Sequence, residues 1–465
     1  MITRVRERLL PVWKRVLSLS WPIMAEHVLR TGMRTTDVIV TGLFSPAAVA
    51  AVGLADLYAR LPLRIGLGLG SGAIALSSQD TGSGATTNRD VAITQSIALG
   101  ILAGIPFILF GVVFGRPAIA ILGAPPEVAR MGGTYLAIIF ATGPARHTAL
   151  IGARALQGTG DTRTPMYINV VSNSLNILGT VGLGLGLGPL PRLGIVGVGV
   201  ATAVGNVFTA ITLLGAIASP WTAASFVLTI DRTIIKQLLV VSAPRIGEGL
   251  AATIAEFPFN SILLGFGTEV NAAYQIGRRM YQQVTAPLSR GYNTAASIVV
   301  GQALGEGDPA AARFNGWATA ALGIVTVGTI GIGLVLGAEQ FVELFTRDAA
   351  TIGYAADFAR AYGLAAPLTV IGLVLAGALR GGSETRVPFI ARTTGMFGFM
   401  LGFTYLTGVW LGYGVLGAYA GIILFYAWNA LVVGAGFYRG SWASRAERMM
   451  AERGSDEDPS VSPDE

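Results

Sequence analysis

The sequence predicts an all-α integral membrane protein with twelve transmembrane helices, arranged as two pseudo-symmetric, parallel six-helix lobes around a central cleft. Of its 465 residues, 52% are hydrophobic and only 12% are charged, whereas soluble domains carry about 25% charged residues. Apolar segments of about 20 residues, the length that crosses a bilayer core, recur along the chain. The chain also repeats itself. This composition excludes a soluble enzyme, a nucleic-acid-binding domain and a disordered scaffold.

Twelve segments are long and apolar enough to span a membrane. Helices are the expected spanning element, because backbone polar groups cannot stay unpaired in lipid. In chain order, the predicted spans lie near 16–42, 47–78, 91–114, 132–153, 164–188, 194–218, 235–264, 270–302, 315–337, 355–379, 387–411 and 414–437.

The spans divide the chain into five parts. We expect a cytoplasmic N-terminal segment (1–15), an N-terminal lobe (16–218), a cytoplasmic linker (219–234), a C-terminal lobe (235–437) and a disordered acidic cytoplasmic tail (438–465). Basic residues are sparse in the loops after odd-numbered spans, where they are Arg116, Arg130, Arg192 and Arg347. The positive-inside rule therefore places both termini in the cytoplasm. Arg far outnumbers Lys, which is typical of a protein encoded by a GC-rich prokaryotic genome. We therefore expect the membrane to be the cell membrane of a prokaryote.

An internal repeat is the most informative feature of the chain. Residues 155–166 read ALQGTGDTRTPM and residues 378–389 read ALRGGSETRVPF. At nearly the same spacing, Gln79 with its two following glycines matches Gln302, and Ser20-Trp-Pro22 matches Ser242-Ala-Pro244. Six spans per half is an even number, so the halves must be parallel repeats. Transporters with this arrangement place the substrate site between the halves.

The repeated loops link spans four and five and spans ten and eleven. Asp161 or Thr162, and Glu384 or Thr385, can cap the helix that follows. A capped turn explains these residues in structural terms. The functional alternative is a pair of rigid cytoplasmic gates, for which the candidate residues are Arg154, Asp161, Arg163, Glu384 and Arg386.

These motifs resemble those of the multidrug and toxic compound extrusion (MATE) transporters, within the multidrug/oligosaccharidyl-lipid/polysaccharide flippase superfamily. The resemblance rests on DVIVTG from Asp37, on the Gln-x-x-Gly-x-Gly sequences after spans two and eight, and on Gln157-Gly-x-Gly-Asp-x-Arg-x-Pro165. It covers residues 16–437. It implies an antiporter that exports amphipathic, usually cationic compounds in exchange for Na⁺ or H⁺.

The first span carries four ionisable residues on one helical face, Glu26, Arg30, Arg34 and Asp37. Such residues are costly inside a bilayer and usually mark a transport pathway. One explanation is an internal ladder of ion pairs. The other makes one carboxylate the site that binds the coupling ion. Asp37 is the first candidate, because it lies deep in the span and matches the family's aspartate there, and Glu26 is the second.

The fifth span carries Asn169, Asn173 and Asn176 on one face. Amide and carboxylate oxygens suit a hard cation such as Na⁺ and can also bond a protonated carboxyl. We therefore place a candidate Na⁺ or H⁺ site at Asp37 and Asn176, with Asn173 and Thr180 beside it. Asparagines that join helices are the structural alternative. In one prokaryotic branch of the family the residue equivalent to Thr180 is an aspartate, so this chain departs from that pattern.

Span seven offers a third carboxylate, Glu256, and another branch of the family uses a carboxylate in this span for ion coupling. Further charged and polar side chains in spans one, two and eight are predicted to line a hydrated cleft. They are Arg30, Arg34, Asp56, Arg60, Arg64, Arg278, Arg279 and Gln282. A cleft rich in arginine favours anionic substrates. A flippase for an anionic or zwitterionic lipid-linked substrate is therefore the alternative function.

The chain lacks the residue sets that enzymes and metalloproteins need. It contains no Cys and only two His, which excludes disulfides, thiolate metal sites and cysteine nucleophiles. No phosphate-binding loop or nucleophile–base pair stands out. We therefore expect no enzymatic activity, no cofactor beyond Na⁺ or H⁺ as coupling ion, and no nucleic-acid partner. The partners expected are the lipid bilayer and an amphipathic small-molecule or lipid substrate. Because one chain contains both halves, we expect a monomer to be able to function.

Overall fold

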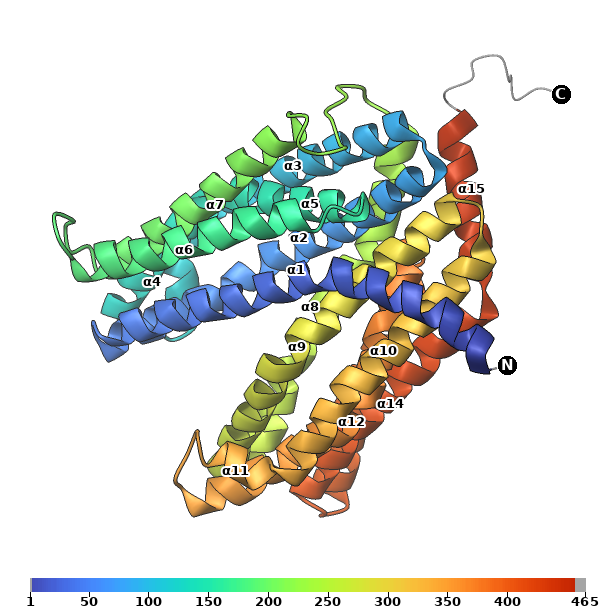
Figure 1. Ribbon diagram of the computed structural model, residues 1–465. Coiled ribbons are helices and arrows are strands. Elements are labelled where there is room, and N and C mark those ends of the chain that lie inside the picture. The colour runs from blue at the N-terminus through green and yellow to red at the C-terminus, as the bar shows by residue number, and fades with distance from the viewer. Residues whose placement is uncertain (1, 456–465) are drawn as a thin grey trace. The chain divides into compact units, whose positions relative to one another are not determined.

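The computed structural model describes residues 2–455, and all regular secondary structure in that range is helical. The first half contains α1 (Ile2–Gly42), α2 (Pro46–Ser83), α3 (Thr86–Ala120), α4 (Pro126–Ala141), α5 (Gly143–Gly158), α6 (Arg163–Leu185) and α7 (Ile195–Ile217). The second half contains α8 (Arg232–Phe266), α9 (Thr268–Gly305), α10 (Pro309–Leu336), α11 (Ala338–Val342), α12 (Ala349–Gly381), α13 (Arg386–Gly395), the π-helices η1 (Met396–Phe403) and η2 (Tyr405–Trp410), α14 (Val415–Arg439) and α15 (Ser441–Ser455). The predicted all-α membrane fold is confirmed (Figure 1).

The helices form two compact units. The N-terminal unit comprises Ala25–Thr81 and Ala85–Ile246, and the C-terminal unit comprises the chain up to Met24, Gly82–Gly84 and the chain from Gly247 onward.

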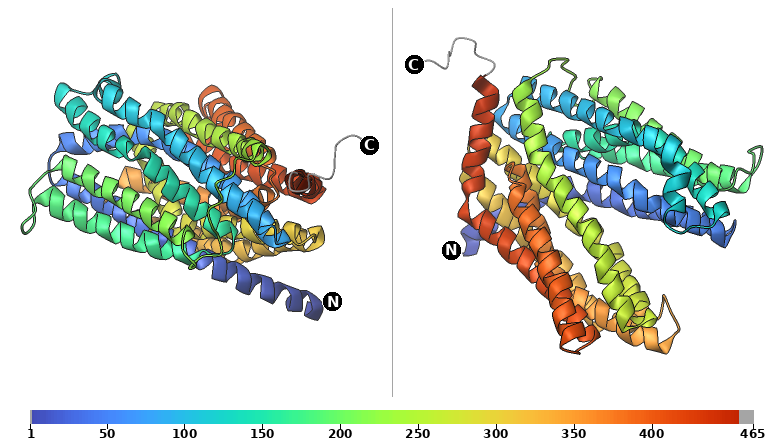
Figure 2. Two further views of the ribbon diagram at one scale, coloured as in Figure 1. Left: turned by 90° about the horizontal axis from the view of Figure 1, so that it is seen from above. Right: turned by 180° about the vertical axis from the view of Figure 1, so that it is seen from behind.

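In the N-terminal unit, α3 packs against α4 and α5, and α7 packs against α4, α5 and α6. Figure 2 shows these helices side by side in two further views. One apolar cluster joins α1, α2, α3, α4 and α7, and a second joins α2, α3, α5, α6 and α7. In the most apolar 18-residue stretch of α3 only 22% of the residues are buried. The rest of that stretch is left to face lipid, as expected of a peripheral membrane helix.

In the C-terminal unit, α12 is the central helix and packs against α9, α10 and α14 (Figure 1). In its most apolar 18-residue stretch 72% of the residues are buried. Glycine allows the closest of these contacts. A Cβ at Gly377 would lie 2.1 Å from the carbonyl oxygen of Asn293, and one at Gly381 would lie 2.3 Å from that of Ser297. The backbones of α9 and α12 therefore touch, which is how small residues join membrane helices.

The sequence repeat reappears in the backbone. Helices α2 and α9 both contain 38 residues. The glycines that follow these helices in the chain have almost equal φ angles, 77° at Gly84 and 74° at Gly307. Before α7 and α14, Gly194 has φ 58° and ψ −133°, and Gly414 has φ 59° and ψ −135°. Equivalent parts of the two halves thus fold in the same way.

Each of the twelve predicted spans coincides with a helical segment. Seven helices in residues 2–455 are long and apolar enough to cross a membrane by length and composition alone. Other long helices, such as α1, α2 and α9, are not among these seven, because charged residues lower their mean hydropathy. The fourth span is divided into α4 and α5 at Thr142, because Gly143 and Pro144 follow and Pro144 has no N–H to donate within a helix.

The chain after residue 438 differs from the prediction of a disordered tail, because α15 occupies Ser441–Ser455. Trp442 is fully buried, stacks on Phe437 with 4.8 Å between ring centroids, and donates its indole N–H to the Phe437 carbonyl. Arg445 forms an ion pair with Glu384 at 3.1 Å. The prediction was wrong here because a few apolar side chains of this polar segment have a packing partner. The predicted tail beyond Ser455 lies outside the described residues.

Candidate functional site

The centre of the candidate site is the carboxylate of Asp37, which lies in α1 and is 9% exposed. The hydroxyl of Thr180 in α6 donates a hydrogen bond to its Oδ1 at 2.8 Å. The same hydroxyl lies 3.3 Å from Oδ1 of Asn176, one turn earlier in α6. Thr180 and Asn176 are 0% and 3% exposed. The structure therefore brings together three of the predicted coupling residues from two helices.

A polar seam between α6 and α7 holds Asn176 in place. Its Nδ2 donates to the hydroxyl of Thr202 in α7 at 3.3 Å. One turn away, Ser172 donates to the carbonyl of Gly205 at 2.8 Å, and Thr209 donates to Ser172 at 2.7 Å. These bonds satisfy hydroxyl and carbonyl groups that lipid cannot solvate, so they fix the rotation of α6 relative to α7.

Two other predicted coupling residues lie in the same unit but outside this contact. Glu26 is buried and forms an ion pair with Arg30 at 2.7 Å, one turn along α1. Asn173 is also buried, and its Nδ2 has no hydrogen-bond partner among the described residues. Glu26 therefore has a local counter-charge, whereas Asp37 is hydrogen-bonded by a neutral hydroxyl.

A group of charges from α1, α2 and α5 lies next to the Asp37 contact. Arg34 is within electrostatic range of both Asp37 and Asp56, and Asp56 is in turn within range of Arg60 and Arg146. The predicted cleft residues of α1 and α2 are thus neighbours in space. Arg64 of α2 is half-buried.

The C-terminal unit contains the remaining cleft residues. Glu256 of α8 forms a short ion pair with Arg278 of α9, and the Arg278 guanidinium lies 5.9 Å from the ring centroid of Tyr274. Arg279 and Gln282 are exposed. Glu256 is therefore held by a resident arginine.

The repeated loops resolve which residues cap the helices. Asp161 Oδ1 accepts hydrogen bonds from the backbone N–H groups of Arg163 and Thr164, at 3.1 and 2.9 Å. Glu384 accepts from the N–H groups of Arg386 and Val387, at 2.8 and 3.3 Å. The acidic residues make these contacts, and the side chains of Thr162 and Thr385 make no cap bond.

The remaining gate residue, Arg154, donates to Gln157 at 3.1 Å. The predicted capped turn is therefore present in both halves, and the role of these loops as gates stays a prediction.

Three members of the site were missed by the reasoning from sequence: Arg146, Tyr135 and Thr202. Arg146 of α5 and the buried Tyr135 of α4 lie within electrostatic range of Arg34 and Asp56. An arginine inside a predicted span is itself a signal, and Arg146 carried it. Tyr135 and Thr202 carried none, because tyrosine and threonine are common in membrane helices.

The oxygen atoms around Asp37 set which ions this site can hold. One carboxylate, one amide oxygen and one hydroxyl converge there. Within residues 2–455 no three His, Cys, Asp or Glu side chains are grouped as a metal site. A multivalent metal centre would need more charged ligands than this set provides. The set fits a proton on Asp37, or a monovalent cation that shares these oxygens with water.

Comparisons with known proteins agree with the fold. The MatE family model matches residues 22–181 and 244–406, once in each half. A probable multidrug resistance protein NorM of Bradyrhizobium diazoefficiens is 28% identical over 88% of this chain and 91% of its own. The NorM-type relative from Thermotoga maritima is 24% identical and covers 95% of each.

Solved structures show the same architecture. A MATE crystal structure in the bent conformation matches with a TM-score of 0.85 and 22% identity, over 97% of this chain and 99% of its own. A MOP superfamily transporter from Pyrococcus furiosus matches with a TM-score of 0.83 and 22% identity, over 94% and 96%. Together with the two matches to the family model, this shows that the chain is a multi-pass membrane protein that belongs to the MATE transporter family.

Proposed function

We propose that the protein is a secondary active antiporter that exports amphipathic small molecules in exchange for H⁺ or Na⁺. The names of its NorM relatives, which denote multidrug resistance, support export of drugs and toxic organic compounds. The observation that carries the coupling role is the contact of Asp37 with Thr180 and Asn176. A buried carboxylate in a membrane helix costs several kcal/mol, so a position that carries one needs a reason.

The hydroxyl of Thr180 gives this contact two distinct states. It has one hydrogen, yet it lies within bonding distance of two acceptor oxygens, Asp37 Oδ1 and Asn176 Oδ1. When Asp37 is ionised, Thr180 donates to it. When Asp37 is protonated, its own O–H donates to the Thr180 oxygen, and the Thr180 hydrogen is free to turn to Asn176. Protonation thereby reverses the direction of the α1–α6 hydrogen bond and adds a hydrogen bond within α6, between Thr180 and Asn176.

This exchange is how ion binding would favour one packing of α1 against α6. A ligand shifts a conformational equilibrium only through its different affinity for the two states. A Na⁺ ion on the same oxygens would have the equivalent effect, because it also neutralises Asp37. Linkage then requires that the ion and the substrate weaken each other's binding. Alternating access follows if the two packings open opposite sides of the membrane, with both termini in the cytoplasm.

The substrate cleft in this proposal includes the charges around Arg34, Asp56 and Arg146. Paired positive and negative side chains suit amphipathic substrates of either sign. The flippase alternative gains no support from the comparisons, since the curated relatives are named for multidrug resistance. We therefore assign these charges to a cleft for small molecules.

Efflux from proteoliposomes tests the proposal. The purified protein is reconstituted, and export of ethidium is driven by a pH gradient or by a Na⁺ gradient alone. Asp37→Asn should abolish efflux under both gradients, while circular dichroism and gel filtration stay like those of the unmodified protein. Gradient-driven efflux at the unmodified rate in this variant would contradict the coupling role.

A matched pair of threonine variants tests the hydrogen bond itself. Thr180→Val removes the hydroxyl that contacts the Asp37 carboxylate, whereas Thr41→Val removes a buried hydroxyl that donates to the backbone carbonyl of Asp37 within α1. We expect Thr180→Val to shift the pH dependence of efflux, and Thr180→Ser and Thr41→Val to leave it unchanged. Equal behaviour of the two valine variants would argue against the hydrogen-bond exchange.

A further inference from the structure

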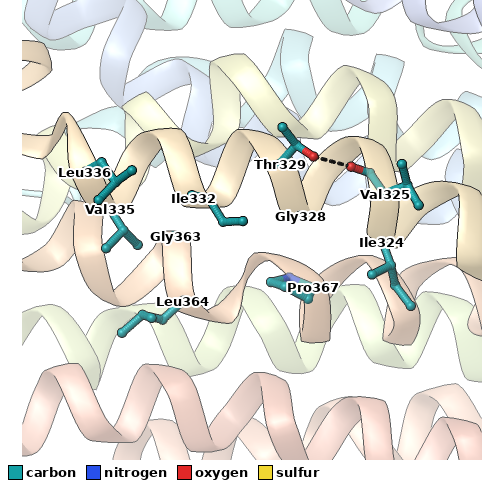
Figure 3. A pocket seen from close by; sticks show the side chains of 10 residues that line it. All are labelled: Ile324, Val325, Gly328, Thr329, Ile332, Val335, Leu336, Gly363, Leu364 and Pro367. Atoms are coloured by element: carbon teal, nitrogen blue, oxygen red, sulfur yellow. Dashed lines mark hydrogen bonds between the residues drawn. The ribbon is translucent and has the colours of Figure 1, made fainter.

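A groove lies between α10 and α12 on the surface of the C-terminal unit (Figure 3). Its volume is about 510 Å³, within the range of small-molecule sites. Its lining consists of Ile324, Val325, Gly328, Thr329, Ile332, Val335 and Leu336 from α10, and Gly363, Leu364 and Pro367 from α12. It is separate from every residue assigned above to ion coupling or substrate transport.

Glycine and proline create this groove. The backbones of α10 and α12 meet at Gly331 and Gly363, where a Cβ on Gly331 would lie 2.6 Å from the Gly363 carbonyl oxygen. Pro367 lines the groove and has no N–H with which to bond that carbonyl. The floor is Gly328, which is buried although a Cβ there would meet no atom closer than 3.7 Å. The floor thus contains room for a larger side chain.

The side chains that line the groove present no free hydrogen-bond donor to a ligand. Its one hydroxyl, that of Thr329, donates to the Val325 carbonyl within α10, as Figure 3 shows. Every other lining side chain is apolar. The lining therefore favours a ligand that is hydrocarbon where it contacts the groove, because a polar ligand would lose more hydrogen bonds to water than it could regain there.

The length of the groove matches one leaflet of a bilayer. From Ile324 to Leu336 the helix rises about 18 Å at 1.5 Å per residue. Half of a hydrocarbon core about 30 Å thick is about 15 Å. The groove follows the C-terminal half of α10, so it lies in the leaflet where that helix ends. These dimensions are those of a single acyl chain.

Charged residues stand at the Leu336 end of the groove. Arg360 precedes Gly363 and Leu364 by one turn of α12, and it bonds Glu339 at 2.7 Å and Asp357 at 2.9 Å. Glu339 lies in α11, three residues after Leu336, the last residue of α10. All three side chains are 40% exposed or more. The cluster thus offers one guanidinium and two carboxylates at the depth of the lipid headgroups.

We propose that this groove binds one acyl chain of a phosphatidylethanolamine-type lipid, with the phosphate at Arg360 and the ammonium group at Glu339 and Asp357. The charges of the cluster are complementary to those of that headgroup. A choline headgroup has no N–H to donate to the carboxylates, and a glycerol headgroup is neutral, so it leaves the phosphate charge without an ammonium group to balance it. The hydrocarbon contact gains little over bulk lipid, so the headgroup provides the selectivity.

Native mass spectrometry of the detergent-solubilised protein tests this site. Phosphatidylethanolamine, phosphatidylcholine and phosphatidylglycerol with identical chains are titrated separately. We expect one phosphatidylethanolamine per chain to be retained preferentially. Gly328→Leu fills the groove and should remove that adduct, whereas Gly333→Leu, on the same helix in open space and outside the lining, should keep it. Arg360→Gln should weaken retention roughly three-fold or more.

Several outcomes would overturn the proposal. They are equal retention of the three lipids, an unchanged adduct in Gly328→Leu, and displacement of the lipid by an exported dye, which would make the groove a drug site. If Gly328→Leu does not fold, Ile332→Trp replaces it, because Ile332 is 62% exposed and lines the same groove. The binding assay requires no transport, so its result is independent of the proposed ion coupling.

Discussion

The buried ion pair between Glu248 and Arg380 gives the sharpest prediction for stability. It joins α8 to α12 within the C-terminal unit, with Arg380 Nη2 2.8 Å from Glu248 Oε2 and side chains 4% and 6% exposed. The Nε atom of Arg392 lies 3.8 Å from the other carboxylate oxygen. Breaking a buried pair by removing one partner typically costs about 3–5 kcal/mol, because the remaining charge is desolvated without compensation. We expect Glu248→Gln to lower the free energy of unfolding by about this amount.

Unfolding by SDS in mixed micelles, followed by circular dichroism, measures this effect. The matched control is Glu339→Gln, which removes the same charge from an exposed pair and should cost less than about 1 kcal/mol. The double variant Glu248→Gln/Arg380→Gln should cost less than the sum of the single variants, because the two side chains share one interaction. A Glu248→Gln protein within about 0.5 kcal/mol of the unmodified one would refute the assignment of this pair as a structural link.

Three further predictions concern the termini and turns. Trp442→Ala should lower the free energy of unfolding by about 3–5 kcal/mol and expose α15 to limited proteolysis, since Trp442 is fully buried. Gly84→Ala should destabilise by about 1–2 kcal/mol in the same SDS assay because φ is 77° there, whereas Gly53→Ala, in open space within α2, should stabilise by about 0.5–1 kcal/mol. Hydrogen bonds from the Thr351 hydroxyl and amide hold the pKa of Asp348 below its usual value. This cap therefore stabilises α12 fully above the usual carboxyl pKa of about 3.9, and the stabilisation is lost as the pH falls through the lower folded pKa. The difference in unfolding midpoint between Asp348→Ala and the unmodified protein should therefore shrink below about pH 4.

Much of the fold could be predicted from the sequence, because it depends on properties that composition and order record. Hydrophobic length sets the spans, since lipid allows few alternatives to a helix. The duplicated loop around Asp161 and Glu384 predicted two equivalent halves, and the nearly identical backbone angles at Gly194 and Gly414 agree with it. The Gly143-Pro144 pair is a sequence signal for the break between α4 and α5 in the fourth span, although no break was predicted there.

The details of the site were less accessible. Asp37 and Thr180 are 143 positions apart, and their contact depends on how α1 packs on α6. A pattern within one helix can show which residues share a face but not what the face meets. For the same reason the sequence could not show that Glu256 is held by Arg278. The tail was predicted as disordered because polar composition hides the single buried ring of Trp442.

The duplication also bears on where ion coupling resides. The repeat spacing is 222 residues in the first span and 223 in the fifth, and at these spacings Asp37, Asn176 and Thr180 correspond to Phe259, Phe399 and Phe403. The C-terminal half therefore has aromatic side chains where the N-terminal half has its buried acid and that acid's partners.

The converse holds at a second set of equivalent positions. Glu26 corresponds to Glu248, but Gln157 and Asn169 correspond to Arg380 and Arg392, so the C-terminal carboxylate is surrounded by resident arginines. An acid with a fixed counter-charge inside the protein has little need of an exchangeable ion. Asp37 retains more of that need, because its hydrogen-bond partner is neutral and its charged neighbour Arg34 also interacts with Asp56. The two halves have thus diverged so that the proposed coupling belongs to the N-terminal unit, and neutralising Glu248 should change stability far more than the ion dependence of transport.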